Sequence, residues 1–204
     1  TGSQFLTQPG QVRLFESEES QVNFQRRDWS SHPVEIRQTH EPVDQNAFNV
    51  PFGSFELPTA GRLDVAEYIS ASRTRFVEDH RFHATDPEST GGIEFIEGKA
   101  RLPKLNVQAK RVIFCQGASG ADNPWFSDVE FKSARGEILT LRIDGLSETR
   151  IVNQGVWLVP CGNGLFKAGS TYDFENLHAG ATESGRDEIL NRLRSFLKLP
   201  VDVL

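Results

Sequence analysis

Between residues 92 and 170 the pattern of hydrophobic positions is almost wholly that of β-strands. Short apolar runs are separated by Gly, Pro, Asn or Asp turns, which is typical of strands in a packed sheet. We expect strands at 92–98, 111–115, 128–132, 137–143, 150–153, 156–159 and 165–170. Asn163-Gly164 lies between the last two strands, and Asn-Gly favours a tight hairpin turn. The sequence therefore predicts that residues 157–159 pair with residues 166–168.

Two stretches have a helical pattern instead. The first covers 64–79, with Asp64 as N-cap and an apolar face that should pack on a sheet, made of Val65, Tyr68, Ile69 and Phe76. The second covers 184–198, where Ser184 and Asp187 resemble a capping box. Its apolar stripe consists of Ile189, Leu190, Leu193, Phe196 and Leu197.

The first 60 residues are richer in loops. Alternating positions predict strands at 10–16, 34–37 and 52–57, and a polar helix runs from Ser17 to Arg27. Together the elements predict an α+β fold with a mixed, mainly antiparallel β-sheet flanked by helices. A chain of 204 residues suits one domain, or one domain with a fragment of a second.

Charge and composition exclude several classes of function. The net charge is −6 with no basic stripe, so nucleic acid is not an expected partner. No apolar run approaches the roughly 20 residues of a membrane helix, and the N-terminus lacks a signal-peptide pattern. We therefore expect a soluble, cytoplasmic protein, whose oligomeric state the sequence does not indicate.

The cysteines and histidines do not indicate a metal site. Cys115 and Cys161 lie in apolar contexts without CxxC spacing, so we expect buried free thiols rather than a disulfide. His80 and His83 have HxxH spacing but no third ligand, which is typical of a solvated surface.

Both ends of the chain suggest a piece of a longer protein. It begins at Thr1 and contains no Met, and residues 197–204 leave a helix, turn at Pro200 and end as a new strand begins. We expect segments beyond both ends.

The stretch with the most chemical interest is Cys115-Gln116-Gly117-Ala118-Ser119, at the end of the apolar run 111–114. Small residues at a sharp turn let a ligand or another backbone approach closely. An ordinary exit from a strand into a loop would look the same.

This turn is one of several motifs that occur in a familiar order. The others are Gly61-Arg62-Leu63-Asp64, Ala134-Arg135-Gly136-Glu137, Trp157-Leu158-Val159-Pro160, Gly169-Ser170-Thr171 and the helix at 184–198. In this order they resemble the D-amino acid oxidase (DAO) superfamily of FAD-dependent oxidoreductases, which includes glycine oxidase and monomeric sarcosine oxidase. The resemblance covers about residues 50–204.

The resemblance implies the following roles. Cys115, Gln116, Gly117, Ala118 and Ser119 would lie near the flavin of the intact protein, and Trp157 and Tyr172 would line a pocket for a small amine or amino acid. An aromatic residue in a strand can equally be core. Because the cofactor carries out the oxidation, we expect no catalytic side chain in this chain.

Two elements of the family are missing from the sequence. It contains no GxGxxG, the turn that binds the FAD pyrophosphate. The Gly-x-Arg-Pro-like segment, whose arginine pairs with a substrate carboxylate, would lie beyond Leu204. We therefore expect the chain alone to be colourless and inactive.

The resemblance also implies a division into domains. Residues 1–110, including the helix at 64–79, would begin the substrate-binding domain, and 111–120 would form an edge of the FAD domain. Residues 121–181 would complete the sheet, and 182–204 would return to the remnant of the FAD domain.

Three functions remain open at this point. The first is the substrate-binding portion of an FAD-dependent amine or amino-acid oxidoreductase. The second is a flavin-free binding module with the same fold. The third is an enzyme acting on a tRNA-linked aminomethyl group, which the lack of a basic surface disfavours.

Overall fold

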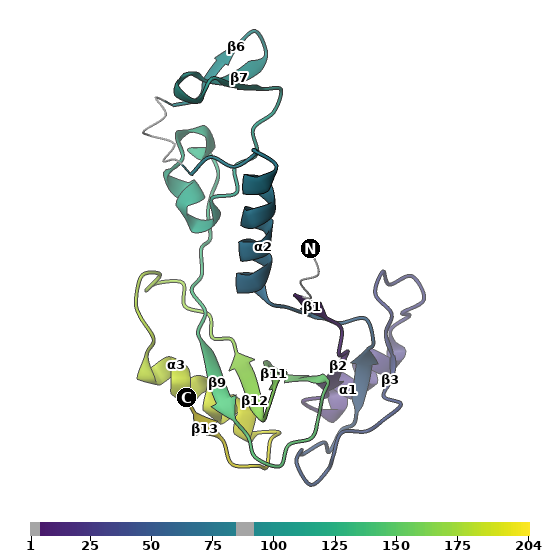
Figure 1. Cartoon of the computed structure of the whole chain (residues 1–204). Helices are drawn as coiled ribbons and strands as arrows, with labels where there is room; N and C mark the ends of the chain where they lie inside the picture. The colour runs from purple at the N-terminus through teal and green to yellow at the C-terminus, as the bar shows by residue number, and fades with distance from the viewer. Residues whose placement is uncertain (1–4, 85–91) are drawn as a thin grey trace. The chain divides into compact units, whose positions relative to one another are not determined.

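A computed structural model describes residues 5–84 and 92–204. It divides into two compact units (Figure 1). We call residues 5–64 and 134–204 the sheet unit, and Val65–Ser133 the insert unit. Which stretch belongs to which functional domain of a parent protein stays a prediction.

The sheet unit contains an eight-stranded sheet in the order β13-β9-β12-β11-β10-β2-β4-β3. The pairing of β2 with β10 is parallel, and the other pairings of this sheet are antiparallel. The fold is therefore the predicted α+β class with a mixed, mainly antiparallel sheet. The strands are β2 (Gln11–Leu14), β3 (Arg37–Gln38), β4 (Ser54–Leu57), β9 (Ile138–Arg142), β10 (Ile151–Gln154), β11 (Val156–Gly162), β12 (Leu165–Gly169) and β13 (Asp202–Val203).

The predicted hairpin at Asn163-Gly164 is confirmed. Leu158 pairs with Ala168 and Val159 with Lys167, and the register shifts once near the turn. Asn163 and Gly164 have φ values of 54° and 71°, the left-handed conformation that a tight hairpin turn requires. A smaller ribbon joins β1 (Leu6–Thr7) to β5 (Arg62–Leu63).

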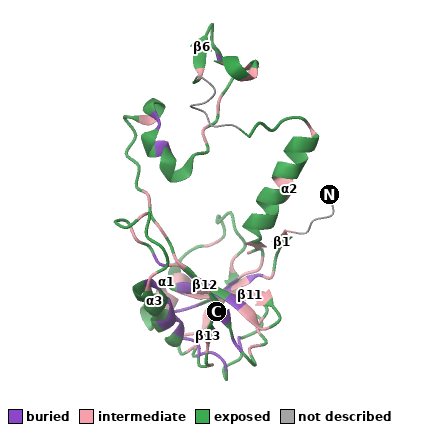
Figure 2. Ribbon diagram, turned by 60° about the vertical axis from the view of Figure 1, so that its left-hand side comes forward, coloured by how far each residue is buried: buried purple, intermediate pink, exposed green. Residues whose placement is uncertain are grey.

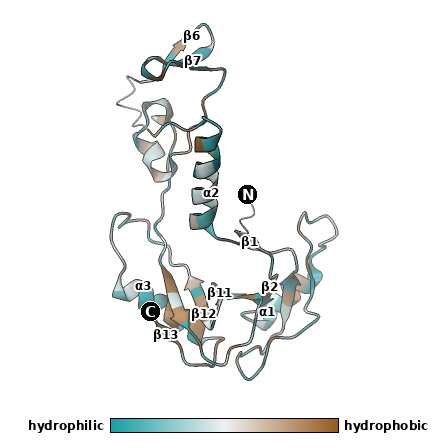
Figure 3. Ribbon diagram, viewed as in Figure 1, coloured by the Kyte–Doolittle hydropathy of each residue, from teal (hydrophilic) through white to brown (hydrophobic). Residues whose placement is uncertain are grey.

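The core lies between the sheet and α3 (Glu183–Arg194). Figure 2 shows the buried residues gathered on the strands and on one side of this helix, and Figure 3 shows hydrophobic residues along β9 and β12. The helix begins one residue earlier than predicted and ends at Arg194 instead of residue 198. Its N-cap is Thr182, whose hydroxyl accepts a hydrogen bond from Gly185 N at 3.0 Å, so the capping box expected at Ser184 is wrong.

Part of the core comes from a loop near residue 48. Phe48 and Phe196 stack with 6.4 Å between ring centroids, and Asn49 N donates to Phe196 O at 2.7 Å. Phe196 follows the helix rather than belonging to it, but it is fully buried as the apolar stripe predicted.

The opposite face of the sheet is covered at one end by α1 (Glu18–Arg26). Ser17 and Ser20 form a capping box at the start of this predicted helix. Phe24 stacks on Phe55 of β4 with 4.3 Å between centroids. This aromatic cluster also contains Phe15 and Trp29.

The insert unit contains α2 (Val65–Glu78), the antiparallel meander of β6 (Glu94–Ile96), β7 (Lys99–Leu102) and β8 (Val107–Ala109), and the 3₁₀ turns Pro103–Leu105, Gly117–Asp122 and Pro124–Phe126. The predicted helix at 64–79 is confirmed. Its apolar face is exposed, however, and none of its residues is buried, so the expected packing on a sheet is not made by the described residues.

Two predicted strands are wrong. Residues 111–115 and 128–132 are irregular, because no neighbouring strand pairs with them in the described parts of the chain. The cysteines are free as predicted but not buried. Cys115 is exposed and Cys161 is partly exposed. Within residues 5–84 and 92–204, no helix has both the length and the apolar character needed to cross a bilayer.

Candidate functional site

The strands β9, β12 and β11 have two unlike faces. Leu141, Phe166, Ala168 and Leu158 are buried beneath α3. Side chains alternate across a strand, and residues directly opposite one another share a face. The other face therefore carries Ile138, Gly169 and Trp157, which are neighbours in the register. We call this surface the open face.

Trp157 of β11 lies on the open face beside Gly169 of β12. It is partly buried, while Val156 and Leu158 on either side of it are buried on the core side. A Cβ added at Gly169 would lie only 3.0 Å from Trp157 Cζ2 and 3.2 Å from Ile138 Cγ1. A side chain at residue 169 would therefore require the indole and Ile138 to shift, and glycine lets the indole lie close against β12. Trp157 therefore belongs to the face opposite the main core.

Tyr172 follows β12 in the same unit. Its side chain is 72% exposed, although Thr171 just before it is buried. An exposed aromatic ring fixed beside a buried residue is available to contact a ligand. The structure thus places Trp157 and Tyr172 in one unit.

The predicted flavin segment lies in the insert unit, whereas Trp157 and Tyr172 belong to the sheet unit. Cys115 and Gln116 are irregular, and Gly117 begins the turn Gly117–Asp122. Gln116 Oε1 accepts from Asn123 Nδ2 at 2.6 Å, and Asn123 Oδ1 accepts from Trp125 N at 2.9 Å. Asn123, which sequence reasoning missed, is buried and holds the turn in shape.

A cavity of about 600 Å³ lies beside this turn. Cys115, Gln116 and Ser119 line it, together with Asn123 and Trp125, whereas Gly117 and Ala118 do not. Trp125 packs edge-on against Phe95 of β6. The lining is largely apolar with a few amide and hydroxyl groups, the usual character of a small-molecule site.

The turn leaves space for a ligand but lacks the sequence motif that binds the FAD pyrophosphate. Gly117 has a φ of 56°, and no atom lies within 4 Å of the position that a Cβ would take, so a ligand can approach the backbone there. The sequence contains no GxGxxG to bind a pyrophosphate. These residues therefore leave room for a ligand at the backbone of Gly117, but they supply no pyrophosphate site.

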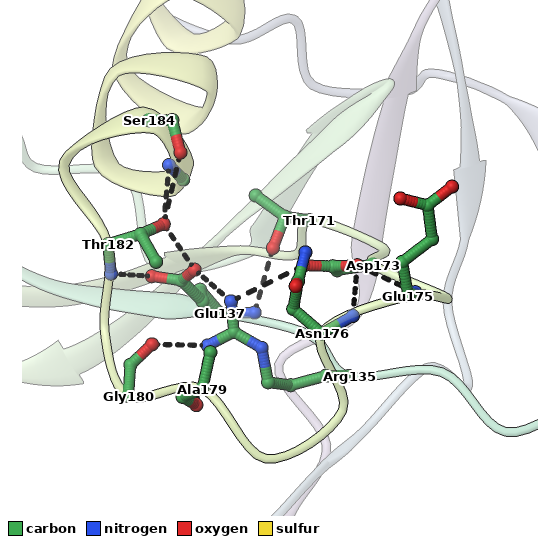
Figure 4. Close-up of polar contacts among 11 residues, drawn as sticks. Arg135, Glu137, Thr171, Asp173, Glu175, Asn176, Ala179, Gly180, Thr182 and Ser184 are labelled. Carbon is green, nitrogen blue, oxygen red and sulfur yellow. Dashed lines mark hydrogen bonds and ion pairs between the residues drawn. The ribbon is translucent and has the colours of Figure 1, made fainter.

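A polar cluster lies at the start of β9. Its Arg-Gly-Glu motif was identified from the sequence, but the residues that bond to it were not predicted. Figure 4 shows Arg135 and Glu137 between Asp173 and Thr182. The pKa of Glu137 is lowered because Thr182 N and its hydroxyl donate hydrogen bonds to the carboxylate, helped by Arg135. Its partners are about 40 residues away in the chain, so no local pattern could reveal it.

In the described parts of the chain, no group of three or more His, Cys, Asp or Glu residues is placed to hold a metal ion. The open face carries Trp157 and Ile138 beside Gly169, and the exposed Thr140 and Lys167 lie farther along the same face. Such a face offers apolar and polar contacts to an organic molecule.

Solved structures share this fold over nearly the whole chain. Glycine oxidase from Geobacillus kaustophilus matches 95% of it with a TM-score of 0.69 and 14% identity. Iminodiacetate oxidase from Chelativorans sp. BNC1 matches 97% with a TM-score of 0.63 and 15% identity. L-proline dehydrogenase from P. horikoshii matches 96% with a TM-score of 0.59 and 13% identity. At these identities the likeness shows the fold alone.

No family model matches the sequence. The chain spans 55 to 60% of the length of these three structures. Its fold is thus that of a large part of several enzymes named for the oxidation of amines and amino acids.

Proposed function

We propose that this chain is the substrate-binding portion of an FAD-dependent oxidoreductase that oxidises a small amine or amino acid. The observation that carries the proposal is Trp157, held over Gly169 on the face of the sheet opposite the core. Its support is a fold shared with amine- and amino-acid-oxidising enzymes and the order of motifs in the sequence.

Within the parent protein, the aromatic residues and the turn Cys115–Ser119 have different roles. Trp157 and Tyr172 contact the substrate, exclude water and fix its orientation. The turn Cys115–Ser119 lies near the flavin, which Gly117 allows to approach the backbone. FAD, when bound by the parent, supplies the conversion of the amine to an imine, with O₂ or another acceptor taking up the electrons.

The test uses the protein expressed from the reading frame that contains this sequence. We expect a yellow protein whose flavin absorption bleaches when small amines or amino acids are added under anaerobic conditions. A protein that stays colourless with added FAD would contradict the proposal. So would a bound flavin that none of the added amines or amino acids reduces.

The alternative is a flavin-free module that binds a small amine or acid. Calorimetry on the 204-residue chain without flavin distinguishes the two. Binding of a small amine or acid to the colourless chain would support the module. The absence of a binding heat for every compound tested would count against it.

A further inference from the structure

The triplet Arg135-Gly136-Glu137 connects the start of β9, the segment after β12 and the start of α3 (Figure 4). It comes directly before β9, and its side chains and backbone bond to Thr171, Asp173, Ala179, Gly180 and Thr182. The contacted segment runs from the end of β12 to the start of α3. Tyr172 lies within it.

Glu137 fixes the start of α3. Its carboxylate accepts from Thr182 N at 2.8 Å and from Thr182 Oγ1 at 2.7 Å. A Cβ at Gly185 would lie 2.5 Å from Glu137 Oε1, so the first turn of the helix fits over this carboxylate only with glycine there. The carboxylate also suits the positive end of the helix dipole.

Arg135 fixes the loop before the helix. Its Nη1 donates to the carbonyl oxygens of Ala179 and Gly180, and its Nη2 donates to Glu137 Oε1 at 2.7 Å. The same Nη2 lies 3.8 Å from Asp173 Oδ2. A planar guanidinium can make these bonds together, whereas a lysine ammonium presents its donors in a different geometry.

Tyr172 is held by its neighbours on both sides. Thr171 Oγ1 accepts from Glu137 N at 2.9 Å, and the backbones of Asp173 and Arg135 exchange two hydrogen bonds of 2.8 Å. This register places Gly136 across from Tyr172. A Cβ at Gly136 would lie 2.9 Å from Thr171 O, so glycine permits the close approach of the two backbones.

We infer that Arg135 and Glu137 are positioning residues for Tyr172, which we propose contacts the substrate. They fasten the segment 171–182 to β9 and α3 and thereby hold the exposed ring of Tyr172 in one place. They need not touch the substrate. The link to the substrate rests on the proposed function, but the link to Tyr172 rests on the contacts described above.

The link to Tyr172 can be tested on the 204-residue chain without any cofactor. The sequence contains two tyrosines, Tyr68 and Tyr172, so a chain labelled with 3-fluorotyrosine gives two fluorine NMR signals that Tyr68→Phe assigns. We expect Arg135→Lys and Glu137→Gln to shift and broaden the Tyr172 signal and to leave the Tyr68 signal unchanged.

Arg150→Lys is the matched control. The side chain of Arg150 is 18% exposed, close to the 15% of Arg135, and it pairs with a carboxylate two residues away in the chain, as Arg135 does. Its substitution should leave the Tyr172 signal unchanged. An unchanged Tyr172 signal in the Arg135 and Glu137 variants, or an equal change in Arg150→Lys, would overturn the inference.

The link to the substrate is tested by kinetics on the flavoprotein. We expect KM to rise about tenfold in Arg135→Lys and Glu137→Gln with kcat nearly unchanged, and neither to change in Arg150→Lys. A moved Tyr172 signal with an unaltered KM would overturn the link to the substrate. If the parent oxidises no amine, the proposed function fails, and the fluorine signals still decide whether Arg135 and Glu137 hold Tyr172 in place.

Discussion

The sheet unit and the insert unit differ in what covers their apolar residues. In the sheet unit, α3 and the loop near Phe48 close over one face of the sheet and bury a continuous core. Among the described residues of the insert unit, Ala100 is the one fully buried hydrophobic residue, while the apolar face of α2 is exposed. An apolar pattern thus marks which face is suited to burial. It does not show whether the covering layer lies in the same stretch of chain.

The largest expected difference in stability is between alanine variants of two phenylalanines, one in each unit. Phe196→Ala should lower the free energy of unfolding of the sheet unit by about 3–5 kcal/mol, because Phe196 is fully buried. Phe76→Ala on α2 should change stability by no more than about 0.5 kcal/mol, because that ring is half exposed. Urea denaturation followed by circular dichroism measures both, and equal losses would contradict the comparison.

Removing an arginine should also lower the free energy of unfolding more in the sheet unit than in the insert unit. Arg150 donates to Glu148 and Glu56, whose side chains are both nearly buried. Arg150→Ala leaves Glu148 without its ion pair and Glu56 with Arg37 as its remaining cationic partner, and it should cost about 3 kcal/mol. Arg75→Ala removes a largely exposed pair with Asp79 and should cost about 0.5 kcal/mol or less. The same denaturation experiment applies. A similar cost for both arginines would show that burial does not distinguish these pairs.

A smaller effect depends on pH. The folded-state pKa of Glu137 is lowered from its ordinary value of 4.5, so its contribution to stability is complete above that value and is lost as pH falls through the lowered pKa. Wild type should therefore exceed Glu137→Gln in stability at neutral pH, and the gap should narrow on acidification to about pH 3. Denaturation midpoints at several pH values measure it. A gap that widens in acid would contradict the assigned shift.

Sequence reasoning succeeded where local chemistry determines the structure. Asn163-Gly164 has the backbone preferences of its turn, and the two strands beside it carry their own alternation. The helical stripe at Ile189, Leu190 and Leu193 is likewise complete within one segment. Such features need no knowledge of distant residues.

Prediction from the sequence failed where the structure of a segment depends on a partner far away in the chain. Residues 111–115 have strand composition, but a strand also needs a neighbour for its backbone hydrogen bonds. Glu137 looked like part of a short motif, yet its role depends on Thr182 and Gly185. For the candidate site, the aromatic residues Trp157 and Tyr172 could be chosen from the motif order, whereas the face on which Trp157 lies became clear only from the register of β11 and β12.

The most direct test of the open face as the substrate side compares two tryptophans of the sheet unit. Trp157 lies on the open face, whereas Trp29 packs in the aromatic cluster with Phe24 at the other end of the sheet. In the flavoprotein, Trp157→Ala should raise the dissociation constant of the preferred amine by about tenfold, equivalent to about 1.4 kcal/mol. Trp29→Ala should leave it unchanged. Unaltered affinity in Trp157→Ala, or equal weakening in both variants, would contradict the account.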